Sequence, residues 1–324
     1  MSKKEDKSTK KKIQNILVGI ISVLVISVLA YFGVDDGQLN KIANDLGIIN
    51  PNNIVDEYIT ADNNSEINKE IIKNEGNLVI DFIDVGQADS ILITNNDNSM
   101  LIDAGNNKDG KKVTKFIQDK GIKKLDYIVG THPHADHIGG MDDVINSNLE
   151  IGKVLMPKMQ TNTKTFEEVL DAIANKNLKI TEPKKGEKFN LGTAEVEVMT
   201  NSIFDEDNLN LSSIILRITF GENSFLFTGD AEKENEDSRE WPKTDVVKIG
   251  HHGSNTSSTE RFINQVQPKY GIIMVGRDNK YGLPKSNIIE RYKKIGTEVY
   301  RTDINGTIEM TSNGKEITIK KERG

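Results

Sequence analysis

The chain has 324 residues, of which 36% are hydrophobic and 28% are charged. This length and composition fit one large or two ordinary globular domains, and they exclude a multi-span membrane protein or a low-complexity chain. Cysteine is absent, which excludes disulfides, thiolate zinc sites and cysteine nucleophiles. A bound metal ion would therefore need ligands from histidine, aspartate or glutamate.

The net charge of −7 is unevenly distributed along the chain. Residues 1–12 carry six lysines, one glutamate and one aspartate, and subtracting this +4 from −7 leaves −11 for the remainder. An acidic body is poorly suited to binding nucleic acid through non-specific neutralisation of phosphates. The charge disfavours such binding over most of the surface, although a local basic groove stays compatible with it.

Residues 13–34 contain no charged side chain. At about 1.5 Å per residue, this segment is long enough to cross the roughly 30 Å hydrocarbon core of a bilayer. Lysines precede it and two aspartates follow it, so residues 1–12 are predicted to be a basic cytoplasmic tail, 13–34 a transmembrane anchor and the rest extracellular. The alternatives are a secretory signal cleaved near residues 28–30 and a buried soluble helix.

Residues 35–76 are rich in polar side chains and are predicted to be a polar linker. From residue 77 to 324, short apolar runs alternate with turn residues, which predicts a folded domain. Strands are expected near 78–85, 90–94, 100–103, 125–129, 153–156, 194–199, 213–220, 223–228, 246–250, 270–275, 297–300, 306–311 and 315–320. Helices are expected near 112–120, 164–175, 258–266 and 286–295. This mixture predicts two packed sheets with helices outside, a four-layer α/β body.

Three of the five histidines fall in the sequence THPHADH, which follows the expected strand 125–129. Imidazole nitrogens and carboxylate oxygens are suitable ligands for zinc and similar divalent ions. His132 and His134, two positions apart, are expected to converge on one ion from an extended loop. Asp136 and His137 are adjacent and point elsewhere, so a second ion is their natural target.

The other two histidines, His251 and His252, directly follow the expected strand 246–250. A metal pair also needs a carboxylate that bridges two cations. Asp230 is the candidate, because it comes just after the strand 223–228 and a glycine that permits an exposed turn. The histidines therefore occur only in two strand-end loops, which indicates use as ligands or as acid–base groups.

The pattern H-x-H-x-D-H followed by a strand-end aspartate and histidine resembles the metallo-β-lactamase superfamily. The segments DFIDVGQADSILI, LIDAG, THPHADHIGG, NLSSIILRITFGENSFLFTGDAE, VKIGHHGSNTSS and YGLP are similar to the hydrolase domain of ComEC-type competence proteins and their stand-alone relatives. The similarity covers roughly residues 77–312. It implies a four-layer αββα sandwich with a dinuclear metal site and a metal-dependent hydrolase activity.

For the metal ligands, the resemblance implies that His132 and His134 hold one ion, that Asp136 and His137 hold the other, and that Asp230 bridges them.

One histidine of the 251–252 pair would complete the second ion. His252 is favoured as the ligand and His251 as a substrate contact or proton donor, although the sequence barely separates them. Catalytic roles are implied for Asp136, Asp230 and His251.

The resemblance also points to other positions near the implied site. Asp89 and Asp103 match acidic positions beside the family's ligands and are candidates to orient them, with turn residues at strand ends as the alternative. Asn210 stands where many superfamily members have a third histidine for the first ion, so that ion is expected to be more weakly held. In the segment GRDNKYGLP, a leucine replaces a histidine that relatives often have. Lys280 and Tyr281 are candidates to bind an oxyanion, with a solvated loop as the alternative.

The predicted function is a membrane-anchored, extracytoplasmic hydrolase that uses a metal-activated hydroxide, most consistent with a phosphodiesterase or nuclease acting on a phosphodiester such as DNA. Two divalent ions are expected, zinc by preference with manganese as an alternative. An amide or ester hydrolase of the β-lactam type and a non-catalytic surface-binding module are the alternatives. No protein partner can be inferred, and one expected membrane span gives no basis for predicting DNA transport.

Overall fold

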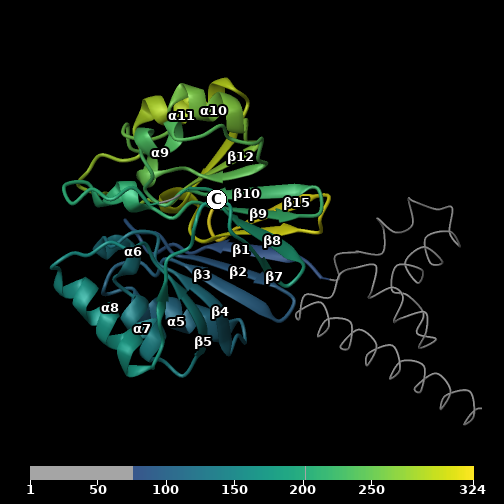
Figure 1. Ribbon diagram of the computed structural model, residues 1–324. Helices are drawn as coiled ribbons and strands as arrows, with labels where there is room; N and C mark the ends of the chain where they lie inside the picture. Colours follow the sequence, from purple (N-terminus) through teal and green to yellow (C-terminus); the bar gives the residue numbers. More distant parts are fainter. Residues whose placement is uncertain (1–75, 201) are drawn as a thin grey trace, which may run out of the picture. The chain divides into compact units, whose positions relative to one another are not determined.

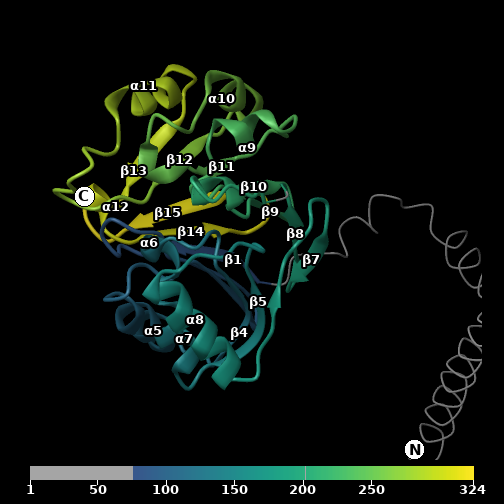
Figure 2. The ribbon, with the colours of Figure 1, turned by 60° about the vertical axis from the view of Figure 1, so that its left-hand side comes forward.

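The computed structural model describes residues 76–200 and 202–324 (Figures 1 and 2). The predicted basic tail 1–12, the anchor 13–34 and the linker up to residue 75 lie outside the described residues. Among the helices of the described part, none combines the length and the apolar character needed to cross a bilayer.

The first sheet has eight strands in the order β15-β14-β1-β2-β3-β4-β5-β6. Its strands are β1 (Leu78–Phe82), β2 (Ile91–Asn95), β3 (Asn98–Ile102), β4 (Lys124–Val129), β5 (Glu150–Leu155), β6 (Ile180–Thr181), β14 (Ile308–Ser312) and β15 (Ile317–Lys321). The strands β3 to β6 run parallel, and β15, β14, β1, β2 and β3 pair antiparallel. The sheet is therefore mixed, with the last strands of the chain joined to the first.

The second sheet has seven strands in the order β13-β12-β11-β10-β9-β8-β7. They are β7 (Lys188–Leu191), β8 (Ala194–Val198), β9 (Leu216–Phe220), β10 (Asn223–Phe227), β11 (Val246–Lys248), β12 (Tyr270–Ile273) and β13 (Glu298–Arg301). β10 to β13 run parallel, whereas β9 and β10 form the hairpin expected from the glycine between them. The strong β-branched and aromatic content of these runs explains their extended conformation.

Helices cover the outer face of each sheet, which gives four layers (Figure 1). The helices are α5 (Gly110–Asp119), α6 (Ala135–Ile138), α7 (Met141–Asn146), α8 (Lys164–Asn175), α9 (Lys233–Asp237), α10 (Glu260–Val266), α11 (Ser286–Lys294) and α12 (Thr302–Asn305). α5, α7 and α8 bury apolar side chains against the first sheet, and α10 and α11 against the second. The predicted pair of packed sheets with helices outside is therefore confirmed.

A central core of apolar side chains joins the inner faces of the two sheets. Phe82 of β1 and Phe227 of β10 meet across it, with their ring centroids 6.3 Å apart. Both rings are at most 2% exposed, and truncating a buried phenylalanine to alanine typically costs about 3–5 kcal/mol. Because β1 and β10 each lead into a loop at the same edge, this core also fixes how those loops face each other.

Several short elements were not expected from the sequence. α6 and α7 follow β4, and α9 follows β10 by six residues. Each has four to six residues, too few to show a helical period of apolar side chains. β6 and β7 are short and largely exposed, so they lack the apolar alternation that marks a strand. Tertiary contacts, and not local propensity, define these elements.

Asp81 on β1 is a buried carboxylate that contacts Lys120 at 2.7 Å. Burial outweighs this attraction and raises the pKa of Asp81 to about 6. A carboxyl group whose pKa is raised on folding stabilises the protein below its unfolded pKa, and that contribution is lost as pH rises through the folded pKa. The replacement Asp81→Asn is therefore expected to gain stability over the wild type between about pH 4 and pH 8, by up to about 3 kcal/mol.

Urea unfolding of both proteins at the two pH values measures this difference. Asp119→Asn, at an exposed position paired with Lys115 on α5, is the control and should show no such pH dependence. A wild-type and an Asp81→Asn protein that respond identically to pH would contradict the expectation.

Candidate metal centre

The loops that carry the predicted ligands leave the carboxyl ends of strands at one edge of the sandwich. The 132–137 loop follows β4, which is parallel to β3 and β5. Asp230 follows β10, and the 251–252 pair follows the parallel neighbour β11. Parallel strands place their carboxyl ends at the same edge, where ligand sites commonly form. In Figure 1 this edge lies on the left, where α6 is labelled.

Ligand-type atoms from these loops meet in one cluster. Asp230 Oδ2 lies 3.2 Å from His137 Nε2 and 3.5 Å from His252 Nε2. His252 Nε2 is also 3.3 Å from Asp136 Oδ2. Within the described residues, three groups have such atoms within 4.8 Å of one another: His132, His137 and Asp230; Asp136, His137 and His252; and Asp89, Asp103 and His137. Side chains almost 120 positions apart along the chain therefore share one site.

The nitrogen atoms of His137 and His252 that face the cluster have no hydrogen-bond partner. His252 Nδ1 lies 2.8 Å from the Met274 carbonyl oxygen, which only accepts, so the lone pair of a neutral ring lies on Nε2. His137 Nδ1 is held in the same way, 2.7 Å from Asp103 Oδ2. Both lone pairs then face carboxylate oxygens, an arrangement that needs a cation or a proton between them. Imidazole and carboxylate donors suit zinc and related divalent ions, so these residues fit such a metal.

Without a metal, the same atoms bind protons. Burial disfavours the imidazolium form of His252, but nearby carboxylates, Asp230 foremost, outweigh it and raise the pKa of His252 to about 10. Burial also opposes charge on His137, yet Asp230 and Asp103 raise the pKa of His137 well above its usual value. Because ligand histidines bind metal through a deprotonated nitrogen, metal and protons compete for these positions.

Asp103 contacts His137 directly and His132 through Thr131. Its Oδ2 accepts a hydrogen bond from Thr131 Oγ1 at 2.8 Å, and Thr131 Oγ1 lies 3.1 Å from His132 Nδ1. The hydroxyl donates to the carboxylate, so it accepts from His132 Nδ1, and the lone pair of His132 lies on Nε2. That nitrogen is 3.0 Å from His134 Nδ1. His134 thus lies beside His132, but it belongs to none of the three groups.

A buried ion pair between Lys248 and Asp89 adjoins the cluster. Lys248 was not among the predicted site residues, because in the sequence it is simply a lysine within an apolar strand. Both residues are 1% exposed. Lys248 Nζ pairs with Asp89 Oδ2, donates to Gly229 O at 2.7 Å and lies 3.5 Å from Asp230 Oδ1. Because one oxygen of Asp230 faces this ammonium, the other is left to face the histidines. Lys248 therefore orients a predicted ligand.

His251 lies at the rim of the cluster and contacts Glu232, another residue that the sequence analysis missed. His251 Nε2 is 3.8 Å from Asp230 Oδ2, and Nδ1 lies 2.8 Å from Thr256 Oγ1 and 3.2 Å from Glu232 Oε1. Asn210 Nδ2 also donates to Glu232 Oε1, at 3.0 Å. Asn210 is thus near the cluster; its amide nitrogen is committed to Glu232, whereas its buried Oδ1 has no hydrogen-bond partner. The sequence signal that could have identified Glu232 is its place two positions after the predicted ligand Asp230.

His251 and His252 both have left-handed backbone conformations, with φ values of 49° and 51°. Residues with a side chain rarely adopt this conformation, and each such residue stores roughly 1–3 kcal/mol of strain. The turn directs the two rings differently, as their exposure shows: the side chain of His251 is 26% exposed and that of His252 only 2%. His251 can therefore be reached from solvent, whereas His252 faces the buried cluster.

The two residues expected to bind an oxyanion lie differently. Tyr281 lines a polar cleft together with Asp136, so it reaches the neighbourhood of the cluster. Lys280 does not line that cleft, and its Nζ lies 5.2 Å from the centroid of the Tyr281 ring. Leu283, which stands where relatives often have a histidine, packs against the apolar core beneath α10 and α11. An apolar side chain at this position contributes to packing.

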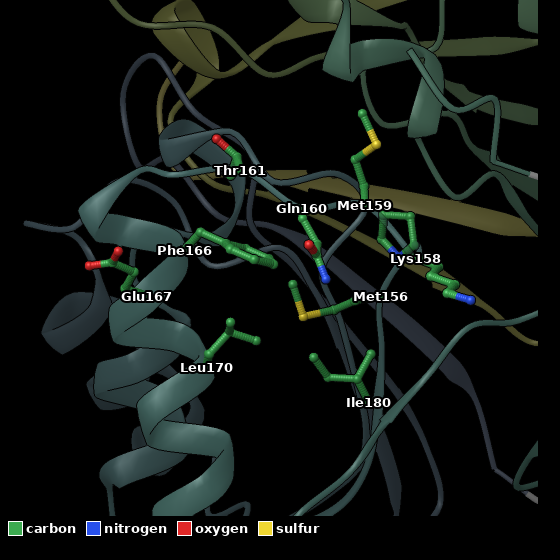
Figure 3. A pocket seen from close by; sticks show the side chains of 10 residues that line it. Met156, Lys158, Met159, Gln160, Thr161, Phe166, Glu167, Leu170 and Ile180 are labelled. Atoms are coloured by element: carbon green, nitrogen blue, oxygen red, sulfur yellow. The ribbon is translucent and has the colours of Figure 1, made fainter. Parts of the chain in front are cut away.

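A second cavity, of about 410 Å³, lies between the segment after β5 and helix α8 (Figure 3). Met156, Leu170 and Ile180 point into it, and Glu167 points away along α8. None of the residues that line this cavity is a histidine or an aspartate. Most of its lining side chains are apolar, so this pocket differs in its chemistry from the His and Asp cluster.

These features define a class, namely an α/β sandwich with a candidate divalent-metal centre at its strand ends. Residues 83–277, more than half of the chain, match the Metallo-beta-lactamase superfamily. The chain belongs to this superfamily, whose members are generally metal-dependent hydrolases.

Among similar proteins, ComE operon protein 3 of Bacillus subtilis (strain 168) is 33% identical over 252 residues, which cover 71% of this chain and 32% of that protein. Recombination protein 2 of Haemophilus influenzae is 28% identical over 255 residues, which cover 75% of this chain and 30% of that protein. The chain is thus related to competence-associated proteins, and it spans about a third of their length.

Among solved structures, the metallo-beta-lactamase fold protein YhfI from Bacillus subtilis superposes with a TM-score of 0.50 at 12% identity, covering 72% of this chain and 100% of that chain. At this identity the likeness concerns the fold alone.

Proposed function

We propose that this protein is a membrane-anchored, extracytoplasmic phosphodiesterase or nuclease that requires divalent metal ions. The proposal depends mainly on one observation. Asp136, His137, Asp230 and His252 converge, and the Nε2 atoms of the two histidines have no hydrogen-bond partner. The relationship to competence-associated proteins supports a phosphodiester substrate, with DNA as the first candidate. The uncharged segment 13–34 supports the membrane anchor, and the lysines before it support the outward placement of the domain.

Two divalent ions are proposed for the centre, zinc by preference and manganese as the alternative. Asp136, His137 and His252 would hold one of them, His132 and His134 the other, with Asp230 between the two. When bound, such ions supply an activated water and positive charge for the developing oxyanion. Because Asn210 stands in place of a third histidine, we expect weaker binding of the ion next to His132 and His134.

The surrounding side chains have distinct proposed tasks. Asp103 and Thr131 fix the ring orientation of His137 and His132. Lys248 holds one oxygen of Asp230 and leaves the other for the cluster. His251 is partly exposed beside Asp230, so it is placed to contact the substrate or to donate a proton to the leaving group.

Removal of metal tests the metal requirement and the reaction class together. The full chain is stripped with a chelator and assayed with bis-p-nitrophenyl phosphate and with a chromogenic cephalosporin, before and after zinc or manganese is restored. We expect phosphodiester hydrolysis to fall by at least about a hundredfold on stripping and to return with the metal.

His134→Ala is the matched variant, and it should lower the content of bound metal measured in the purified chain. Cephalosporin hydrolysis alone would favour an amide or ester hydrolase instead. Metal binding without turnover of either substrate would favour a non-catalytic binding module.

A further inference from the structure

A polar cleft of about 500 Å³ opens beside the metal centre. The side chains that line it include Asp136, Gln87, Asn106, Asn107, Lys108 and Tyr281. They are contributed by the loops after β1, β3, β4 and β12. The cleft therefore lies over the strand ends that carry the candidate ligands.

The cleft adjoins the candidate centre at Asp136. His132, His137, Asp230 and His252 are at most 2% exposed, whereas the side chain of Asp136 is 33% exposed and lies in the cleft wall. A substrate that approaches the centre from the Asp136 side therefore contacts the cleft residues next to the reacting group.

Tyr281 presents its ring to solvent from a fixed loop. It is 57% exposed, and the ammonium of Lys280 lies 5.2 Å from the centroid of its ring. Asn279 holds the loop in place, because its amide donates to Gly276 O and Leu283 O, and its Oδ1 accepts from the backbone of Tyr281 and Leu283. An exposed aromatic ring on a fixed loop is suited to stacking against a planar group.

The remaining walls are polar, and Lys108 is their only cationic side chain among the lining residues. Lys108 is exposed and has no ion-pair partner in the described part of the chain. Gln87 joins two walls of the cleft, since its Oε1 accepts from Gly276 N at 3.1 Å and its carbonyl accepts from Asn106 Nδ2 at 3.1 Å. The cleft is thus already formed, with an aromatic ring, amides and one free ammonium.

We propose that this cleft binds one nucleotide of a nucleic-acid strand, with its base stacked on Tyr281 and a neighbouring phosphate on Lys108. Inside a duplex both faces of a base are covered by its neighbours, so a base within a strand can stack on a protein ring only where it is unpaired. The inference rests on the proposed phosphodiesterase function and names its substrate class: a single strand is bound and cleaved in preference to a duplex.

The test measures binding of the metal-loaded full chain to a phosphorothioate strand that resists cleavage, by fluorescence anisotropy. The same strand without bases is the comparison ligand. We expect removal of the bases to weaken binding to the wild type about tenfold, Tyr281→Ala to weaken binding of the normal strand about tenfold, and the two changes together to cost no more than either alone. Tyr281→Phe should retain the preference for the strand with bases.

Charge variants test the phosphate contact. Lys108→Gln should lower the affinity for the strands with and without bases to a similar extent. It should also reduce the number of counterions released on binding, measured from the salt dependence, by about one. Lys111→Gln, an exposed position three residues further along the chain, is the control and should leave both values unchanged.

Independent effects of Tyr281→Ala and base removal would overturn the inference, as would equal affinity for duplex and single strand. If the wild type hydrolyses phosphodiesters but shows no coupling between Tyr281 and the bases, the subsite fails while the proposed function stands. If coupling is found but no phosphodiester is hydrolysed, the nucleotide subsite stands while the proposed function fails.

Discussion

Replacing Asp230 with alanine is expected to lower metal affinity by at least about a hundredfold and to abolish hydrolysis. Asp230 Oδ2 is the atom that approaches His137 and His252, and it lies 3.8 Å from His251 Nε2. Without this carboxylate, His137 Nε2 and His252 Nε2 lose the one oxygen atom that approaches both of them. Metal content after dialysis, titration calorimetry and the rate with bis-p-nitrophenyl phosphate measure the effect.

Asp230→Asn has nearly the same shape and separates the loss of charge from the loss of packing. It should bind metal almost as weakly as Asp230→Ala while remaining folded, because Lys248 keeps its pair with Asp89. Asp171→Ala, at an exposed position of α8, is the control. If Asp230→Asn binds metal and hydrolyses bis-p-nitrophenyl phosphate like the wild type, Asp230 is not a metal ligand of the centre.

The second large effect is expected for Lys248→Met. This change keeps the length of a fully buried side chain but removes the ammonium that pairs with Asp89 and faces Asp230. Breaking a buried pair from one side typically costs about 3–5 kcal/mol, because a charge is left buried without its partner. The unfolding free energy of the chelated chain, measured with urea, should fall by about this amount.

Part of that loss should be recovered when the second charge is removed as well. In the double variant Lys248→Met with Asp89→Asn, the cost should be clearly smaller than the sum of the two single changes. Lys243→Met, at an exposed position before β11, should change stability by less than about 0.5 kcal/mol. Additive single effects would show that the pair is not the source of the instability.

The candidate ligands were predicted from local sequence because each one follows an apolar strand directly. THPHADH comes after β4, Asp230 after β10 and the histidine pair after β11. A strand end followed by metal-binding residue types is a local feature, and so is the repeated use of histidine at such places. The roles of the individual side chains as ligands stay predictions until metal binding is measured.

Lys248 and Glu232 were missed because their importance depends on distant partners. Lys248 lies in an apolar strand, where a lysine usually marks a sheet edge or a solvated face. Only the position of Asp89, which is 159 residues earlier in the chain, shows that its ammonium is paired and buried. Glu232 likewise gains a role from Asn210 and His251, which come from two separate loops.

The sequence by itself determined all strands of the two sheets except the short β6 and β7, the longer helices and the residue types available to a metal, since these depend on local apolar periodicity and on short motifs. The tertiary structure decided which sheet edges coincide, which imidazole nitrogens face carboxylates, and which cleft opens over Asp136. Those features depend on the pairing of strands and the packing of two sheets across a shared core. They are set by contacts between residues far apart in the chain, for which a single sequence has no local signal.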